Sequence, residues 1–164
     1  LLDTGVPVHG IGFQSHFRTD LALPWDKLPA NFERFRELGL ELAITELDIR
    51  IPEPVTPEKL QAQARYARRY LSAALEAGIR DITMWGVTDK ASWIPHTFEN
   101  YDAGLLRDAR YKPKPFHDAV REVFRTHAAQ ADGGEPIVPP LNFRAFLPVM
   151  EVLPGETARF PAPR

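Results

Sequence analysis

The sequence lacks cysteine altogether, and none of its apolar runs approaches the roughly 20 residues that a membrane-spanning helix needs. Without cysteine there is no disulfide framework, no thiolate metal site and no cysteine nucleophile. The chain also lacks an excess of either charge, since 20 Lys and Arg stand against 22 Asp and Glu. This balance argues against binding through bulk charge, so we expect neither nucleic acid nor a membrane as a partner.

Several common signatures of catalysis and metal binding are missing as well. Residues 10–12 form a bare Gly-x-Gly without a third glycine or a following helix, so a dinucleotide fingerprint is weak. Ser15 next to His16 is not a catalytic pair, because adjacent side chains on a strand point to opposite faces. The sequence has no Walker A, HExxH or EF-hand pattern, and its histidines lack metal-ligand spacing: His9, His16, His96, His117 and His127. We therefore expect no metal and no cofactor.

What the 164 residues do contain is a repeated alternation of strand-like and helix-like segments. Short apolar runs predict strands at 8–16, 42–49 and 81–87, and helical periodicity predicts helices at 31–38, 57–77 and 115–126. Three strand-then-helix units in succession predict an α/β fold with a parallel sheet and right-handed crossovers.

The helix at 57–77 carries the clearest signals. Thr56 is a suitable N-cap, Pro57 suits the first helical position and Gly78 follows the end. Its apolar stripe is Leu60, Ala64, Ala67, Leu71, Ala74 and Leu75, with Gln63 expected on the polar side. The last helix has the stripe Phe116, Ala119, Val120, Val123 and Phe124, and Gly39 is placed to end the first helix.

Two segments fall outside this alternation. Residues 88–113 form a loop of about 25 residues without clear regular structure, which in a compact domain is usually functional or disordered. Its aromatic residues argue against disorder. Seven of the 16 prolines lie beyond Asp132, so residues 128–164 are interpreted as a proline-rich tail or linker, with room for a short strand near Phe146. The predicted boundary lies between residues 127 and 128.

Polar side chains gather at the carboxyl ends of the predicted strands, where parallel α/β folds place their ligand sites. Alternation along each strand groups Gln14 with His16, Ile44 with Glu46 and Asp48, and Thr83 with Trp85. Taken singly, each has an ordinary structural interpretation as a cap, an ion-pair partner or a core residue. Three strands that deliver polar groups to one end weaken that interpretation. We expect His16 to donate to Glu46, and Asp48 to fix the tautomer of a nearby histidine.

Three motifs carry a resemblance to a known family: GIGFQSH at 10–16, ITELDI at 44–49 and WGVTDKASW at 85–93. They closely resemble family 10 glycoside hydrolases, most of which are endo-1,4-β-xylanases. Order and spacing also fit, down to Gly-Leu-Leu at 104–106 and Lys-Pro-Lys-Pro at 112–115. The resemblance covers residues 1 to about 125.

The resemblance implies that residues 1–127 are the last three β/α units, strands six to eight, of a (β/α)8 TIM barrel. Glu46 matches the family's catalytic nucleophile, His16 the histidine that hydrogen-bonds it, and Asp48 a carboxylate that supports the network through His16. The side chains that match substrate-binding residues are Gln14, Trp85 and Trp93. The implied reaction is retaining hydrolysis of internal β-1,4-xylosidic bonds of xylan or xylo-oligosaccharides, without a metal or cofactor.

One part of the family pattern has no counterpart here. The family's acid/base glutamate lies upstream in a W-x-V-x-N-E type motif, but Trp25, which precedes Glu46, is followed by Asp-Lys-Leu at 26–28. An eight-unit barrel takes about 250 residues. We therefore expect a C-terminal part of a longer xylanase that is inactive when isolated. The parent protein is expected to be an extracellular monomer.

Two alternatives stay open at this point. The chain is a non-catalytic carbohydrate-binding piece that retained the aromatic platform, or it belongs to an exo-acting or mixed cellobiose–xylan β-glycosidase of the same fold. These residues do not distinguish a preference for xylan from a preference for cellobiosides.

Overall fold

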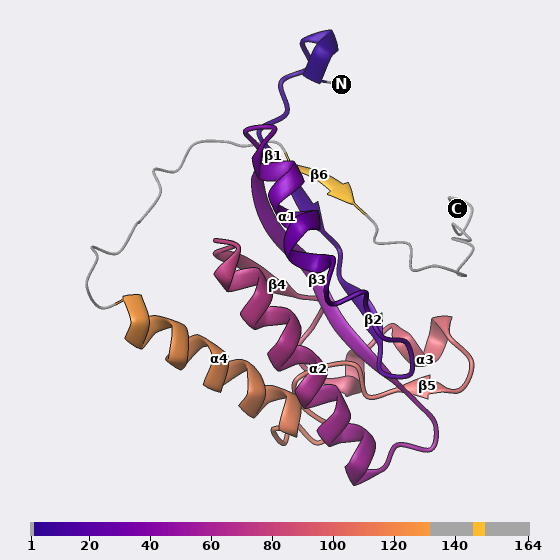
Figure 1. Cartoon of the computed structure of the whole chain (residues 1–164). Coiled ribbons are helices and arrows are strands. Elements are labelled where there is room, and N and C mark those ends of the chain that lie inside the picture. The colour runs from indigo at the N-terminus through magenta and orange to yellow at the C-terminus, as the bar shows by residue number, and fades with distance from the viewer. Residues whose placement is uncertain (1, 132–145, 150–164) are drawn as a thin grey trace.

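The computed structural model of the chain describes residues 2–131 and 146–149. Helical elements are η1 (Leu2–Thr4), α1 (Leu28–Arg36), α2 (Pro57–Glu76), η2 (Asp89–Ala91), α3 (Ile94–Thr97) and α4 (Pro115–Ala131). The strands are β1 (Gly10–Phe13), β2 (His16–Arg18), β3 (Glu41–Pro52), β4 (Asp81–Met84), β5 (Tyr101–Asp102) and β6 (Phe146–Val149). Figure 1 shows β3 as the long strand through the middle of the sheet.

The sheet is built around β3, which pairs in parallel with β1, β2 and β4. Only the two-residue β5, at the far end of β3, runs antiparallel to it. On its other edge β1 pairs in parallel with β6, Gly10 opposite Phe146. The predicted α/β class with a parallel sheet is therefore confirmed.

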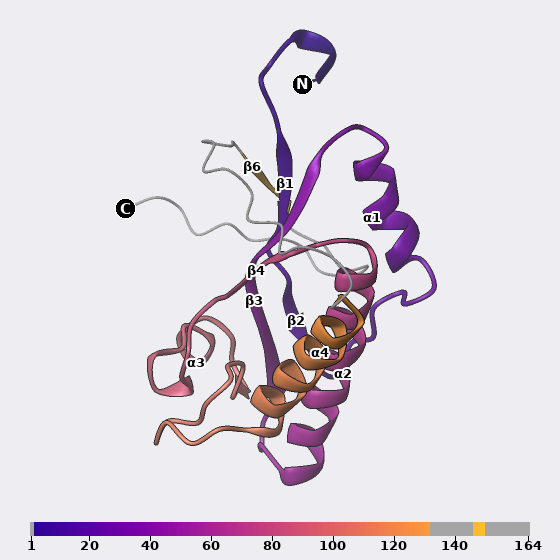
Figure 2. The same ribbon diagram turned by 90° about the vertical axis from the view of Figure 1, so that its left-hand side faces the viewer.

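The two faces of the sheet are covered differently. Figure 2 shows α1, α2 and α4 on one side of β3, and the segment with α3 on the other side, near the carboxyl end of β3. The helical side holds the apolar core, so the opposite side is left for polar side chains. The described part of the chain contains no helix long and apolar enough to cross a membrane.

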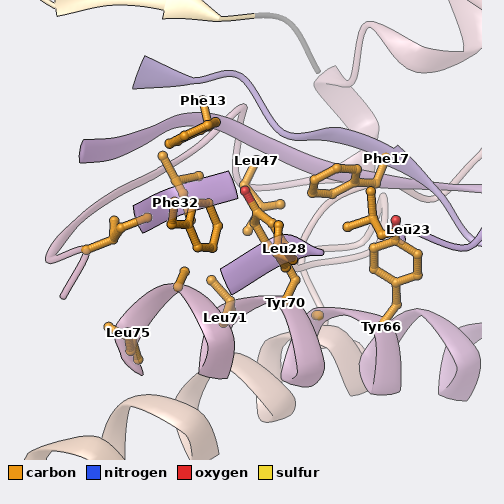
Figure 3. Close-up of a cluster of buried hydrophobic side chains, with 14 of the residues drawn as sticks. Phe13, Phe17, Leu23, Leu28, Phe32, Leu47, Tyr66, Tyr70, Leu71 and Leu75 are labelled. Atoms are coloured by element: carbon orange, nitrogen blue, oxygen red, sulfur yellow. The ribbon is translucent and has the colours of Figure 1, made fainter. Parts of the chain in front are cut away.

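The core lies between α2 and the strands, where large side chains from both layers interlock (Figure 3). Tyr70 of α2 stacks edge-on to Phe17 with ring centroids 4.7 Å apart, and Phe13 stacks edge-on to Phe32 at 5.2 Å. All four of these rings are fully buried. Burying them fixes α1 and α2 against β1 to β3, and this holds the carboxyl ends of the strands in register.

The predicted first strand is divided into β1 and β2. Ser15 adopts a left-handed backbone conformation with φ of 64°, and its buried hydroxyl lies 2.6 Å from the Tyr70 hydroxyl. This hydrogen bond to α2 offsets the cost of the left-handed conformation. The break turns Ser15 towards the helix, while Gln14 and His16 remain on the opposite side of the sheet.

The predicted grouping of Ile44 with Glu46 and Asp48 on one face is wrong. Ile44 is fully buried in the same core cluster as Leu47, on the helical side. The pairing of β3 with β4 shifts register between Ile44 and Leu47, so strict alternation fails across these residues. Beyond the shift, Leu47 faces the core and Glu46 and Asp48 face the site.

Helix α2 follows its sequence signals closely. The Thr56 hydroxyl accepts a hydrogen bond from the backbone amide of Lys59, and Gly78 has a φ of 84° just beyond the helix. The placement of Gln63 on the polar side is wrong, because this side chain is fully buried. Its amide nitrogen donates to the carbonyls of Ile49 and Ala103, each at 2.6 Å. It thus ties α2 to β3 and to the segment after β5.

Replacing Gln63 by methionine should lower the free energy of unfolding by about 2 kcal/mol, because two buried carbonyls lose their donor. Chemical denaturation followed by circular dichroism measures this change. Gln61→Met, at an exposed position of the same helix, is the matched control and should change stability little. Equal stabilities for the two variants would contradict a structural role for the Gln63 amide.

The remaining predictions on secondary structure need smaller revisions. Helix α4 extends to Ala131, five residues beyond the predicted end at Thr126, and Phe124 of its predicted stripe is 40% exposed. The loop predicted at 88–113 contains η2, α3 and β5. In the proline-rich region, Phe146 begins the short strand β6, while 132–145 and 150–164 lie outside the described residues.

Candidate active site

A histidine bridges two carboxylates on the polar side of the sheet. His16 and Asp48 are paired residues of β2 and β3. The Nε2 atom of His16 lies 3.1 Å from Oε2 of Glu46, and its Nδ1 atom lies 3.1 Å from Oδ2 of Asp48. The first contact is a hydrogen bond; the second has the distance of an ion pair without hydrogen-bond alignment. His16 therefore contacts both predicted partners, Glu46 through a hydrogen bond and Asp48 at ion-pair distance.

The two carboxylates differ in their surroundings. The Asp48 side chain is 1% exposed, whereas the Glu46 side chain is 18% exposed. Gln14 approaches Glu46 from β1, with its amide nitrogen 3.4 Å from Oε1 of the glutamate. Glu46 is thus held by the Gln14 amide and the His16 imidazole, and solvent can still reach it. Asp48 is the buried carboxylate.

Two tryptophans flank this histidine. The indole nitrogen of Trp93 donates to Oδ2 of Asp48 at 2.7 Å, and its ring lies 4.9 Å from the His16 ring. Trp85 stands edge-on to His16 at 5.8 Å and is 46% exposed. Its backbone amide donates to the Leu47 carbonyl, which fixes it at the end of β4. The structure thus brings all six predicted site residues together.

The surroundings of His16 favour its cationic form. Burial opposes the positive charge, but contacts with Asp48 and then with Glu46 outweigh burial and raise the pKa of His16 above 6.5. The tryptophans Trp85 and Trp93 are the other rings packed on it. A protonated imidazole has a donor on each nitrogen, so it can orient both carboxylates at once.

The raised pKa of His16 predicts how stability depends on pH. The folded state binds this proton more tightly than the unfolded state, so the stabilisation is complete below about pH 6.5 and is lost as the pH rises through the folded-state pKa. Urea denaturation across this range measures it. His16→Asn should remove this component of the pH dependence, and His9→Asn, at an exposed histidine, should preserve it. The same slope in the His16 variant would contradict the assignment.

The loop that carries Trp93 is anchored by a buried ion pair that the sequence pattern did not reveal. Lys114 and Asp89 have side-chain exposures of 6% and 9%, with Nζ 2.7 Å from Oδ2. Nζ also donates to the Ala103 carbonyl at 2.6 Å, and Oδ1 of Asp89 accepts from the Leu105 amide at 2.9 Å. These contacts join both ends of the loop, so Trp93 is set on a fixed support.

A second missed feature extends the polar side of β3. Arg50 follows Glu46 and Asp48 at the same two-residue spacing and is only 5% exposed. Its guanidinium lies 4.0 Å above the Phe98 ring and 5.3 Å from the Tyr101 ring. The period-2 pattern beyond Asp48 was the available signal. The aromatic partners come from the loop, whose course could not be read from its sequence.

No group of three or more histidine or acidic side chains suited to a metal ion occurs in residues 2–131 or 146–149. A reachable carboxylate is held by an imidazole and an amide beside two indoles. Such a carboxylate is suited to nucleophilic attack on a carbon centre, and indole faces suit the apolar faces of sugar rings.

Known proteins resemble this chain over most of its length. Residues 1–123 match the model of glycosyl hydrolase family 10. Endo-1,4-beta-xylanase B of Thermotoga neapolitana is 40% identical over 125 residues, covering 75% of this chain and 36% of that protein. Endo-1,4-beta-xylanase 5 of Pyricularia oryzae is 35% identical over 144 residues, covering 87% of this chain and 35% of that protein.

Solved structures show the same likeness. Xylanase 10B from Thermotoga petrophila, in complex with xylobiose, matches with a TM-score of 0.72 at 40% identity, over 76% of this chain and 38% of that one. Native xylanase 10B from Thermotoga maritima matches with a TM-score of 0.74 at 39% identity, over 79% and 40%. The chain spans between a third and two fifths of the length of these relatives. The predicted family is confirmed: this chain belongs to glycosyl hydrolase family 10, a family of (β/α)8-barrel glycosidases.

Proposed function

We propose that this chain carries the nucleophile of a retaining endo-1,4-β-xylanase, with Glu46 in that role. The observation that supports it most is the bridge from Asp48 through His16 to Glu46. It leaves the more exposed carboxylate fixed in orientation and open to a substrate. Asp48 is buried and accepts from Trp93, so it acts as a positioning residue for His16.

The proposed reaction has two steps. A carboxylate oxygen of Glu46 attacks the anomeric carbon of a xylose unit; the glycosidic C–O bond breaks, and the leaving oxygen takes a proton from a general acid. Water then gives that group a proton, attacks the same carbon and releases Glu46. Two inversions restore the original configuration. His16 and Gln14 keep the carboxylate oxygens aimed during both steps.

Trp85 and Trp93 are proposed to bind the sugars around the cleaved bond. The exposed face of Trp85 suits stacking on a xylose ring, and the hydrogen bond from Trp93 to Asp48 couples that subsite to His16. In this proposal β1 with β2, β3 and β4 are strands six, seven and eight of the barrel. Residues 1–127 are assigned to the catalytic domain and 128–164 to a proline-rich tail or linker, whose first residues continue α4 to Ala131 and which includes β6, paired with β1.

The general acid is proposed to come from barrel units beyond those in this chain, since a retaining pair needs a second carboxylate about 5–5.5 Å from the nucleophile. Asp48 does not suit this role because it is buried against His16 and Trp93. We expect the 164-residue chain to hydrolyse xylan at no measurable rate. Release of xylo-oligosaccharides by the purified chain would contradict this.

The experiment that tests the proposal is a chimera in which residues 2–131 replace the matching segment of the Thermotoga maritima xylanase 10B. Its match to this chain covers 40% of that xylanase, which leaves the rest of a barrel to pair with β1 and β4. A chimera with a cooperative thermal transition should hydrolyse xylan. A folded chimera without activity would overturn the proposal.

A non-catalytic carbohydrate-binding role is the second candidate, favoured by the 46% exposure of Trp85. It predicts xylohexaose binding by the folded chimera with no hydrolysis. Comparing xylan with aryl cellobiosides in the same assay tests the mixed-substrate alternative. An extracellular location and a monomeric state for the parent enzyme belong to the main proposal; the location suits polymeric xylan as substrate, since the polymer is too large to enter a cell.

A further inference from the structure

Arg50 is a buried, charged side chain whose guanidinium packs on the aromatic rings of Phe98 and Tyr101. It is 5% exposed, and its guanidinium lies 4.0 Å over the ring of Phe98. A buried cation is costly unless it is compensated, and a desolvated guanidinium over a ring is the stronger form of the cation–π contact. The pairing therefore holds Phe98 at one place over the end of β3.

From Phe98 a continuous set of contacts leads to Glu46. Phe98 packs edge-on to Trp93, with centroids 5.3 Å apart and rings at 76°. The Trp93 indole donates to Oδ2 of Asp48 at 2.7 Å, the same oxygen that lies 3.1 Å from Nδ1 of His16. The Trp93 indole is therefore held at two places: Phe98, which packs on Arg50, contacts its ring, and Asp48 accepts a hydrogen bond from its nitrogen.

Arg50 has a second aromatic contact, with Tyr101, which belongs to a hydrogen-bonded cluster. Tyr101 lies 5.3 Å from the Arg50 guanidinium and 5.0 Å from that of Arg18, and the phenol donates to Asp20 at 3.0 Å. Hydrogen bonds from Arg18 lower the pKa of Asp20 to about 2. This cluster therefore keeps its charges across the neutral pH range, and no ionisation change within it displaces Phe98 or Arg50 there.

We propose that Arg50 is a positioning residue of the active site: acting through Phe98, it holds the Trp93 indole on Asp48 and so fixes the orientation of His16 at Glu46. The contacts do not depend on the assigned reaction; only the last step, the benefit to catalysis, rests on the proposed function. The test measures the coupling between Arg50 and His16 directly.

Nuclear magnetic resonance on the full 164-residue chain provides two readouts that need no activity. The chain has three tryptophans, so the indole N–H of Trp93 is one of three such signals and is assigned with Trp→Phe variants. Its solvent exchange reports the bond to Asp48, and titration of the His16 ring reports the contacts of His16. Arg50→Met and Phe98→Leu should speed indole exchange at least about tenfold and move the His16 pKa. Arg50→Lys, which keeps a cation, should lie between these variants and the wild type.

The matched control is Arg69→Met, because Arg69 lies 4.6 Å over the Trp25 ring at an exposed position of α2. It should change neither the Trp93 signal nor the His16 titration. Unchanged Trp93 exchange in a folded Arg50→Met chain overturns the proposal; where that variant does not fold, Phe98→Leu decides by the same measurement. A chimera that is inactive while these shifts occur would contradict the proposed function and leave this inference standing.

Discussion

Replacing Glu46 by alanine is expected to lower kcat of the chimera on xylan by roughly 10⁴-fold or more, because no covalent intermediate can form without the nucleophile. The backbone of β3 and its core neighbours are untouched by this change. Glu46 is half-buried rather than part of the core cluster, so the thermal transition should stay close to that of the parent chimera. Loss of activity without loss of fold is the expected combination.

Rescue of the Glu46→Ala variant by azide tests specifically whether Glu46 is the nucleophile. With an activated aryl xylobioside, azide enters the space left by the Glu46 carboxylate and attacks the anomeric carbon, so the product is a glycosyl azide of inverted configuration. Rescue by azide separates a nucleophile from a residue that only binds substrate. Glu37→Ala, at an exposed glutamate after α1, is the control and should keep full activity. Near-normal hydrolysis by the Glu46 variant would exclude it as nucleophile.

Replacing Lys114 by methionine is expected to lower the free energy of unfolding by roughly 3–5 kcal/mol, since the buried Asp89 carboxylate is left without its cation. The carbonyl of Ala103 also loses its donor. Both partners are nearly inaccessible to water, at 6% and 9% side-chain exposure, so solvent cannot replace the lost contact. Urea denaturation of the 164-residue chain measures the loss.

A second substitution separates two contributions to the lost stability, the unpaired charge of Asp89 and the lost packing of Lys114. Asp89→Asn keeps an oxygen that can accept from the Leu105 amide but removes the negative charge. The double variant Asp89→Asn with Lys114→Met should therefore recover much of the lost stability. Lys112→Met, at an exposed lysine two residues away, should be nearly neutral. A double variant as unstable as Lys114→Met alone would show that packing, not charge, dominates.

Local signals in the sequence were reliable wherever one element alone decides the outcome. Helix α2 begins after Thr56 and ends before Gly78 because capping and backbone preference act over a few residues. The two-residue spacing of Glu46 and Asp48 likewise predicted correctly that they share one face. The same spacing failed for Ile44, because the register shift lies between Ile44 and Leu47.

Features that need two distant segments were missed. Gln63 looked like a surface residue because its partners, the carbonyls of Ile49 and Ala103, lie 14 and 40 residues away. Lys114 and Asp89 are 25 residues apart, and neither residue's burial is visible in its neighbours along the chain. A side chain's burial is set by which segments meet over it, and this depends on the whole fold.

The sequence by itself determined the family, the parallel α/β plan and the six residues of the candidate site, because motifs and periodicity are local properties. Only the tertiary structure decided that His16 faces Glu46 with one nitrogen and Asp48 with the other. It also placed the Arg50 guanidinium over the ring of Phe98, which packs against Trp93. Those relations are distances of a few ångströms between strands and a loop, and the packing of Phe13 and Phe17 of the strands against Phe32 and Tyr70 of the helices is what sets them.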